Sequence, residues 1–487
     1  MSKQGPLADS YPAAVALVIL ALTPFLVLTS AVSSLNELIG RSVHLSEAEL
    51  EMTAGMANAA YCFGTVLSIQ LITRLRPRRV LAVLVLAFVL ASIAAAWAPS
   101  AGPFVAGRVI QGLATSMMLI AAVPPLVIGW PKARQRWTAM TMNLAVFGAV
   151  ALGPVVGGVA VGLETWRTVF WIVAAFGCGA LVLVALTYED APAQDPDAPV
   201  DVISVTLAAV GTAAAFFGVS EVSAHSFGAP IVLVPLLAGV ALIVLLLVHQ
   251  YEARDALMPV EKLARTIPVA AIVVAMTAAA VSVGLVDLAG AALELRKVDP
   301  THGAMLFWPE FGGAVATAAL FGAIYFTRWV PVVAFAGIFV LVGAAAVLSG
   351  VATGSDALVL VGSGATGVGV GASVAPALFT TGFTLPSPEL PRVFALIELL
   401  RGVAAFLAGP LLLHLSETVG ASPASGIEAA VWVAFGIALL GAVVAASVWV
   451  AGRARLQRPD IDPWLAGDAP AIDTTPLPAP RPTPRST

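Results

Sequence analysis

The sequence predicts an all-α integral membrane protein with fourteen transmembrane helices, and three observations support this fold class. Of the 487 residues, 59% are hydrophobic and 11% are charged, and the mean hydropathy is +0.97. A water-soluble domain of this length would not need so large an apolar fraction. Apolar runs of roughly 20 residues, the length of a helix that crosses a hydrocarbon core, recur along almost the whole chain. These runs do not alternate between polar and apolar residues, which favours helices over barrel strands.

The apolar runs and the short connections between them give the order of the elements. We expect helices at residues 12–34, 52–73, 80–98, 103–129, 138–162, 168–187, 202–221, 229–249, 267–291, 303–326, 331–350, 356–381, 393–415 and 428–451. A weak internal repeat is visible, because Thr73-Arg74 and Thr327-Arg328 each precede an apolar helix that a Gly-rich helix follows. Repeated halves are typical of secondary transporters.

This repeat divides the chain into four predicted parts. They are an N-terminal six-helix bundle (1–187), two linker transmembrane helices with flanking cytoplasmic loops (188–266), a C-terminal six-helix bundle (267–452) and a cytoplasmic tail (453–487). Because the tail is rich in Pro and has little to bury, we expect it to be disordered.

Basic residues beside the predicted helices indicate the orientation. Lys and Arg gather in alternate connections, as in RLRPRR (residues 74–79) and PKARQRW (residues 131–137). Cytoplasmic loops carry this excess, so both termini of the multi-pass chain are predicted to be cytoplasmic. The preference for Arg over Lys, with much Ala, Gly and Val, indicates a GC-rich bacterial source, so we expect the protein in the bacterial cytoplasmic (inner) membrane.

Several classes of chemistry find no support in the sequence. Cys62 and Cys178 lie in apolar runs, and the five histidines lack the spacing of metal ligands. Sets of nucleophile and base at matching depth, which a membrane-embedded enzyme needs, are not recognisable. We therefore expect no metal, no cofactor, no nucleic-acid partner and no enzymatic activity.

A buried arginine is the most informative polar residue. Arg108 lies inside the fourth predicted helix, where a guanidinium costs about 2.5–3.5 kcal/mol to insert. It is therefore expected to face protein or water, and Gln111, one turn later, adds a second polar group on the same side. The alternative is that Arg108 snorkels to the outer headgroups.

The fifth predicted helix carries a proline among glycines. Pro154 bends a helix because it cannot donate a backbone hydrogen bond, while Gly153, Gly157 and Gly158 let a neighbouring backbone approach closely. A bent helix that packs this closely on its neighbour could act as a hinge and prevent leakage of ions or substrate through the protein. The alternative is ordinary packing of small residues.

These motifs resemble those of a known family. FVAGRVIQGLAT (residues 104–115) is similar to the fourth-helix motif of proton-coupled transporters of the major facilitator superfamily. GAVALGPVVGG (148–158) is similar to the antiporter motif, and TWRTVFW (165–171) to the signature before the sixth helix. Together with residues 362–376 and 397–402, they make the chain resemble a divergent fourteen-helix drug:proton antiporter. The resemblance implies two six-helix bundles plus two extra central helices.

The chain departs from the family pattern at two acidic positions. Thr29 stands where the family has an acid in the first helix, and Thr73 replaces the acid of the cytoplasmic loop motif, which keeps Arg74, Arg78 and Arg79. Proton coupling by the usual route is therefore in question. The resemblance implies a substrate cavity, which we expect Gln111, Asp287, Thr29 and Ser33 to line.

Other acidic residues are candidates for proton coupling. Asp287 and Glu310 fall in the outer half of their helices, and we predict that they act with Arg108, with Asp287 as its counter-charge across the cavity. The alternative is that Asp287 is hydrated at the headgroup level. Glu398 and Arg401 are spaced as a structural ion pair on one helix face, with a second proton site or an inner gate as the alternative.

The resulting functional prediction is a secondary active transporter that works by alternating access. It would export amphipathic or hydrophobic small molecules, such as drugs, metabolites or lipids, in exchange for protons, with the proton gradient as energy source. The alternatives are a facilitator or symporter for a lipid or metabolite and, in other classes, a membrane-embedded enzyme or a sensor. We expect a monomer whose partners are the substrate and the lipid bilayer.

Overall fold

Helices account for most of the chain that the computed structural model describes, residues 5–188 and 192–477. The N-terminal half contains α1 (Tyr11–Val43), α2 (Glu47–Arg74), α3 (Pro77–Trp97), α4 (Ala101–Ile128), α5 (Lys132–Asn143), the π-helical η1 (Leu144–Gly148), α6 (Ala149–Gly162) and α7 (Trp166–Thr187). The linker contains α8 (Val202–Ser220), the 3-10 turn η2 (Glu221–Ser223), α9 (Pro230–Glu252) and α10 (Val260–Leu263). The C-terminal half contains α11 (Thr266–Leu295), α12 (Pro300–Met305), α13 (Trp308–Ile324), α14 (Val330–Leu348), α15 (Asp356–Gly382), the turn η3 (Ser387–Glu389), α16 (Leu390–Thr418) and α17 (Pro423–Ala451), and α18 (Ile461–Ala466) follows in the tail.

Fourteen segments within the described residues are long and apolar enough to cross a membrane, which confirms the predicted number. The segments α5, η1 and α6 form one span, Lys132–Gly162, and α12 and α13 form another, Pro300–Ile324. The first two helices extend further toward their connection than predicted. The reason is local: Ser46 and Glu49 form a reciprocal capping box that starts α2 among polar residues, where hydropathy gives no signal.

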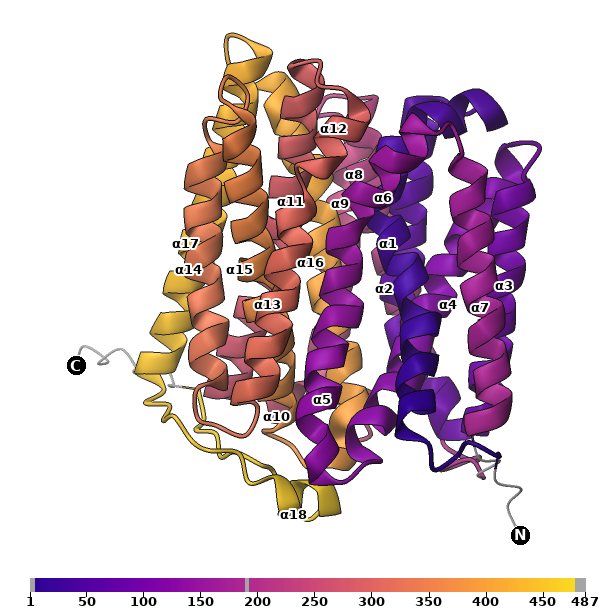
Figure 1. Cartoon of the computed structure of the whole chain (residues 1–487). Coiled ribbons are helices and arrows are strands. Elements are labelled where there is room, and N and C mark those ends of the chain that lie inside the picture. Colours follow the sequence, from indigo (N-terminus) through magenta and orange to yellow (C-terminus); the bar gives the residue numbers. More distant parts are fainter. Residues whose placement is uncertain (1–4, 189–191, 478–487) are drawn as a thin grey trace.

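The two halves stand side by side with their long helices roughly parallel to one axis (Figure 1). The linker helices are central in the sequence but peripheral in space. Helix α8 packs against α2 and α16, one from each half, and α9 packs on α8. Only 28% of the residues in the most apolar stretch of α9 are buried by the rest of the protein, so this helix offers most of its surface to lipid.

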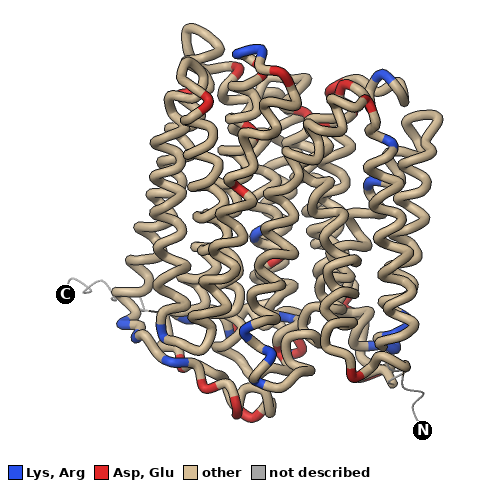
Figure 2. The backbone as a smooth tube through the Cα atoms, viewed as in Figure 1, with Lys and Arg blue, Asp and Glu red and all other residues tan. Residues whose placement is uncertain are grey.

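Both ends of the described chain lie at the same end of the helix bundle, which we call the terminal face (Figure 1). The other end is the opposite face. Figure 2 shows that Lys and Arg gather at the terminal face, whereas the middle of the bundle holds few charges.

The tail differs from its prediction of disorder, because residues 453–477 are folded against the terminal face. Trp464 of α18 is fully buried, its ring lies edge-on to Phe383 at 5.2 Å, and its indole N–H donates to the Leu385 carbonyl at 3.0 Å. Composition indicated disorder since the segment is rich in Pro and has few apolar residues to bury. A single large aromatic side chain and a ready-made pocket between α15 and α16 outweigh that composition. Residues 478–487 of the predicted tail lie outside the described residues.

Candidate functional site

A cavity of about 770 Å³ lies between the two halves, toward the opposite face. Helices α1, α2 and α6 form its wall on the N-terminal side, and α11, α12 and α16 form the other wall. The cavity reaches the surface, since its lining includes exposed residues such as Glu47 and Asp299. A space shared by two halves is where a transporter of this architecture holds its substrate.

Carboxylates dominate the charges of this cavity. Its lining contains Glu37, Glu47, Glu51, Asp287, Glu294 and Asp299, and the basic residue in the same lining is Arg41, which pairs with Glu37. Walls of one charge sign concentrate ions of the other sign in a confined space. The cavity therefore carries a negative electrostatic potential.

The residues predicted to line the cavity divide into two groups. Asp287 and Ser33 are among its lining residues. Thr29 and Gln111 are not among them: the Thr29 hydroxyl donates to the Leu26 carbonyl of its own helix, 2.7 Å away. Gln111 lies inside the N-terminal half. Helical periodicity could not separate these groups because both lie on inward-facing surfaces.

Arg108 is 3% exposed and faces protein on all sides, so it does not snorkel to the headgroups. Its guanidinium lies 5.4 Å from the ring centre of Phe25 and 5.9 Å from that of Phe170, and it donates to the Gln111 side chain at 3.1 Å. The Gln111 amide in turn donates to the Ser92 hydroxyl at 2.8 Å. These contacts tie α4 to α1, α3 and α7.

The hypothesis that Asp287 is the counter-charge of Arg108 does not fit this arrangement. Among the described residues no carboxylate pairs with Arg108, and Arg108 does not line the cavity that contains Asp287. Two aromatic rings and an amide occupy the place expected for the acid. Cation–π contact supplies part of the stabilisation that a carboxylate would give.

Asp287 and Glu310 lie on two different helices of the C-terminal half, α11 and α13. Asp287 is half-buried on α11, where its carboxylate faces Gly409 of α16. Glu310, in the first turn of α13, is 4% exposed, and its Oε2 atom has no hydrogen-bond partner within the described part of the chain. A buried carboxylate without a partner is costly when charged, and such residues in membrane spans mark proton or ion pathways.

Glu398 and Arg401 form a buried ion pair on α16. The Arg401 Nε atom lies 3.1 Å from Glu398 Oε1, and its Nη2 atom lies 2.5 Å from Oε2. Across the interface, the Tyr61 hydroxyl of α2 donates to Glu398 Oε2 at 3.1 Å. The pair therefore lies at the interface and joins the two halves through Tyr61.

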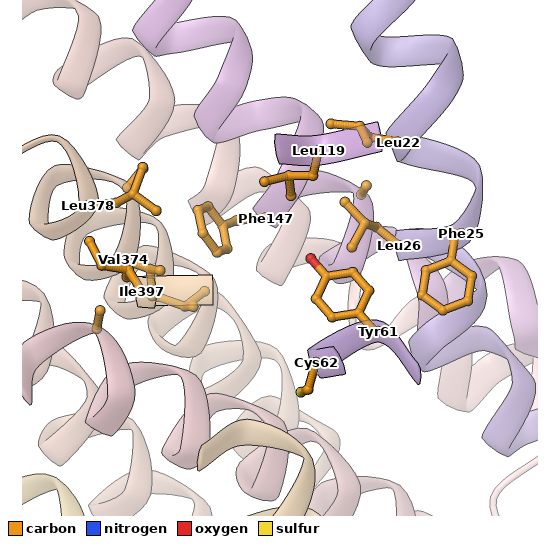
Figure 3. Packing of buried hydrophobic residues seen from close by; sticks show 14 of the residues in the cluster. Leu22, Phe25, Leu26, Tyr61, Cys62, Leu119, Phe147, Val374, Leu378 and Ile397 are labelled. Carbon is orange, nitrogen blue, oxygen red and sulfur yellow. The ribbon is translucent and has the colours of Figure 1, made fainter. Parts of the chain in front are cut away.

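Apolar side chains surround this pair and fill the space between the halves. Figure 3 shows Phe147 between Leu119 of the N-terminal half and Val374 and Leu378 of the C-terminal half. The Arg401 guanidinium lies 6.0 Å from the Phe147 ring centre. On the same helical span, the Asn143 amide donates to the Gly371 carbonyl of α15 at 3.0 Å. These contacts pack the two halves together on the side of the cavity that faces the terminal face.

The proline of the fifth span has a partner that sequence reasoning missed. Because Pro154 has no N–H, the Val150 carbonyl one turn earlier lacks its helical donor. The Ser30 hydroxyl of α1 donates to that carbonyl at 2.7 Å. The sequence holds no signal for this contact, because Ser30 looks like any other serine of the first helix.

The glycines around Pro154 allow close contact with both halves. A Cβ atom on Gly157 would lie 2.6 Å from the Ala31 carbonyl oxygen of α1, and one on Gly158 would lie 2.9 Å from that of Pro300 at the start of α12. Gly153 similarly packs on the backbone and side chains of α1. The motif therefore forms a seam between the two halves beside the cavity.

The basic loop motif lies at the terminal face. Arg74 is in the last turn of α2, and Arg78 and Arg79 are in the first turn of α3. The Arg78 guanidinium donates to the Ala185 carbonyl at the end of α7, 3.0 Å away. This contact links the connection between the second and third spans to the sixth.

No group of three His, Cys, Asp or Glu side chains with a geometry for metal binding occurs in the described residues.

The family model described as Major Facilitator Superfamily matches residues 17–293. The chain therefore belongs to the major facilitator superfamily, and its fold is that of a multi-pass membrane transporter.

Curated relatives support this class at low identity. The MFS-type transporter YubD of Bacillus subtilis is 26% identical over 65% of this chain and 62% of its own length. A multidrug resistance protein B homolog of Mycobacterium tuberculosis is 28% identical over 70% of this chain and 64% of its own length. The lincomycin resistance protein LmrB of Bacillus subtilis is 28% identical over 35% of this chain and 36% of its own length. The matched region thus spans less than two thirds of each of these relatives.

Solved structures show the same fold. A POT family transporter in complex with 5-aminolevulinic acid superposes with a TM-score of 0.65 at 11% identity, over 91% of this chain and 97% of that one. The human organic anion transporter MFSD10 superposes with a TM-score of 0.59 at 15% identity, over 91% of this chain and 100% of that one. At such identities the likeness concerns the fold alone.

Proposed function

We propose that this transporter exports amphipathic or hydrophobic small molecules by alternating access, in exchange for protons. The observation that carries the proposal is the cavity between the halves, which reaches the opposite face and contains Asp287 in its wall. Relatives named for lincomycin and multidrug resistance support the substrate class.

The orientation in the membrane is part of the proposal. The terminal face carries most of the basic residues, which favours a cytoplasmic position for it and for both termini (Figure 2). In that orientation the cavity opens away from the cytoplasm. The structure then corresponds to the state that releases an exported substrate.

In this proposal, Asp287 and Glu310 take up and release the exchanged proton. Asp287 borders the cavity, and Glu310 lies buried one turn beyond Phe307, which also lines it. Thr29 and Thr73 stand where the family pattern has acidic residues. We therefore assign the proton to Asp287 and Glu310, which both lie in the outer half of their helices. Arg108 has a supporting role, because it fixes the packing of α1, which forms one wall of the cavity.

Flux measurements in proteoliposomes test the proposal. Ethidium and lincomycin serve as probes, each followed with and without an imposed pH gradient across the membrane. We expect a pH gradient to drive accumulation of at least one probe, and Asp287→Asn or Glu310→Gln to abolish that dependence on the gradient. The matched control is Glu428→Gln, which removes an exposed carboxylate of α17 outside the cavity.

Two results would contradict the proposal. Flux that is the same with and without the gradient would indicate a facilitator. Full gradient dependence in the Asp287→Asn/Glu310→Gln double variant would show that other groups carry the proton.

A further inference from the structure

The folded part of the tail crosses the terminal face from one half of the transporter to the other. We call residues 455–477 the C-terminal strap, with α18 at its tip (Figure 1). It leaves α17 in the C-terminal half and reaches α5 in the N-terminal half. A segment that contacts both halves is sensitive to their relative motion.

The strap is attached firmly to the C-terminal half at its tip. Trp464 is fully buried and donates to the Leu385 carbonyl, and Ile461 is 1% exposed. The Ala471 and Ile472 amides both donate to the Phe383 carbonyl, at 2.8 and 3.1 Å. An aromatic anchor with satisfied polar groups contributes far more than exposed contacts do.

The end of the strap is attached to the same half. The Thr266 amide donates to the Thr475 carbonyl at 3.0 Å, and the Thr475 hydroxyl donates to the Gly452 carbonyl at 2.7 Å. Between tip and end, the strap folds back on itself: the Gln457 side chain donates to the Asp473 carbonyl and accepts from the Asp473 amide. The strap is thus a closed loop held by the C-terminal half.

The attachment to the N-terminal half is much weaker. Asp462 of α18 pairs with Lys132 at the start of α5, 2.5 Å away, and the two side chains are 68% and 45% exposed, respectively. Helix α18 also packs against α5. Nearby, the Tyr325 hydroxyl donates to the Gln135 side chain at 3.4 Å, so the strap lies over a contact between the halves.

We propose that the strap is a latch that holds the terminal face closed and releases at α5 when that face opens. The difference between its two attachments decides where it releases. The buried tryptophan stays with the C-terminal half, whereas the exposed ion pair to Lys132 breaks. The latch favours the state whose cavity reaches the opposite face, and it acts without any substrate.

Distance measurements between the halves test the latch. Spin labels are placed at Leu75→Cys and Arg328→Cys, exposed positions on the N-terminal and C-terminal sides of the terminal face, in a chain with Cys62→Ala and Cys178→Ala. The full-length protein in nanodiscs should show mainly the short distance. Deletion of residues 456–487 or Trp464→Ala should increase the population at longer distance.

Charge exchange isolates the weak contact. An exposed ion pair changes an equilibrium by up to about fivefold, so Asp462→Lys should raise the ratio of open to closed molecules by about two- to fivefold. Adding Lys132→Asp should restore the original ratio. Asp468→Asn, an exposed acid of the same strap beyond α18, is the matched control and should have no effect.

The outcomes are distinct from those of the flux experiment, since no substrate or pH gradient is present. An unchanged distance distribution after deletion of the strap would overturn the latch. So would a shift in the Asp462→Lys variant that Lys132→Asp does not reverse, because the effect would then not depend on the ion pair.

Discussion

The two halves each bury an arginine, and the two sites differ in how the charge is satisfied. Arg108 in the N-terminal half is surrounded by two aromatic rings and one amide, with no carboxylate partner in the described chain. Arg401 in the C-terminal half is neutralised by Glu398 on its own helix. Both sites use a spacing of three residues on one helix face.

The Arg108 site is therefore fixed within one half, whereas the contacts of the Arg401 site depend on the position of the other half. The partners of Arg108 belong to the N-terminal half and do not titrate, so the site holds that half together as a rigid body. The partner of Arg401 is a carboxylate that also accepts a hydrogen bond from Tyr61 of the other half. Motion between the halves therefore changes the contacts of the Arg401 site and leaves those of Arg108 unchanged.

The largest loss of stability is expected from a substitution that breaks the ion pair between Glu398 and Arg401. Arg401→Ala leaves Glu398 buried without its counter-charge, which costs about 3–5 kcal/mol for pairs of this kind. We expect a clear fall in the thermal unfolding midpoint of the purified protein in detergent. The double variant Glu398→Leu/Arg401→Met should recover most of the loss, because it removes both charges together. A stable Arg401→Ala protein would show that the pair is not buried as described.

An intermediate effect is expected at Arg108. Arg108→Ala removes the contacts with Phe25 and Phe170 and leaves a void, and cation–π contacts of buried groups contribute about 0.5–2 kcal/mol. Arg108→Met should be better tolerated, since it fills the space and buries no charge. The measurement is the same unfolding midpoint. If Arg108→Met were as damaging as Arg401→Ala, the contrast between the two sites would fail.

The smallest effects distinguish contacts within a half from contacts between halves. Tyr61→Phe removes one buried hydrogen bond, and Ser92→Ala removes two, one to the Phe88 carbonyl and one from the Gln111 amide. A buried hydrogen bond in membrane proteins contributes about 0.6 kcal/mol on average. Both should lower the unfolding midpoint slightly. Only Tyr61→Phe should also increase the open population in the spin-label measurement, because only its bond crosses the interface. Equal shifts in both variants would remove this distinction.

The sequence predicted the spans well because hydropathy acts over whole helices. It also placed Arg108 on an interior face, since the cost of a charge in lipid leaves few alternatives. It did not predict the neighbours of Arg108, because aromatic rings such as Phe25 resemble any other apolar residue in a composition window. Tyr61 and Ser30 were missed for the same reason: their partners lie far away in the chain.

The strap shows a case in which composition alone predicted the wrong structure. Residues 453–477 read as a Pro-rich tail, yet the burial of Trp464 determines their structure. The pocket that receives the indole is built by Phe383 and Leu385, about eighty positions earlier, and no local pattern announces it.

The π-helical turn at Leu144–Gly148 has a consequence for how one span serves several neighbours. Each residue of an α-helix rotates the chain by about 100°, and a π turn holds one residue more than an α turn, so it rotates everything after it relative to a regular helix. Asn143, before the turn, meets α15, and Ser30 and Pro300 meet the helix after it. Deletion of a single residue here would rotate the rest of the span by about 100° relative to its first part. The glycines of α6 would then no longer meet α1 and α12.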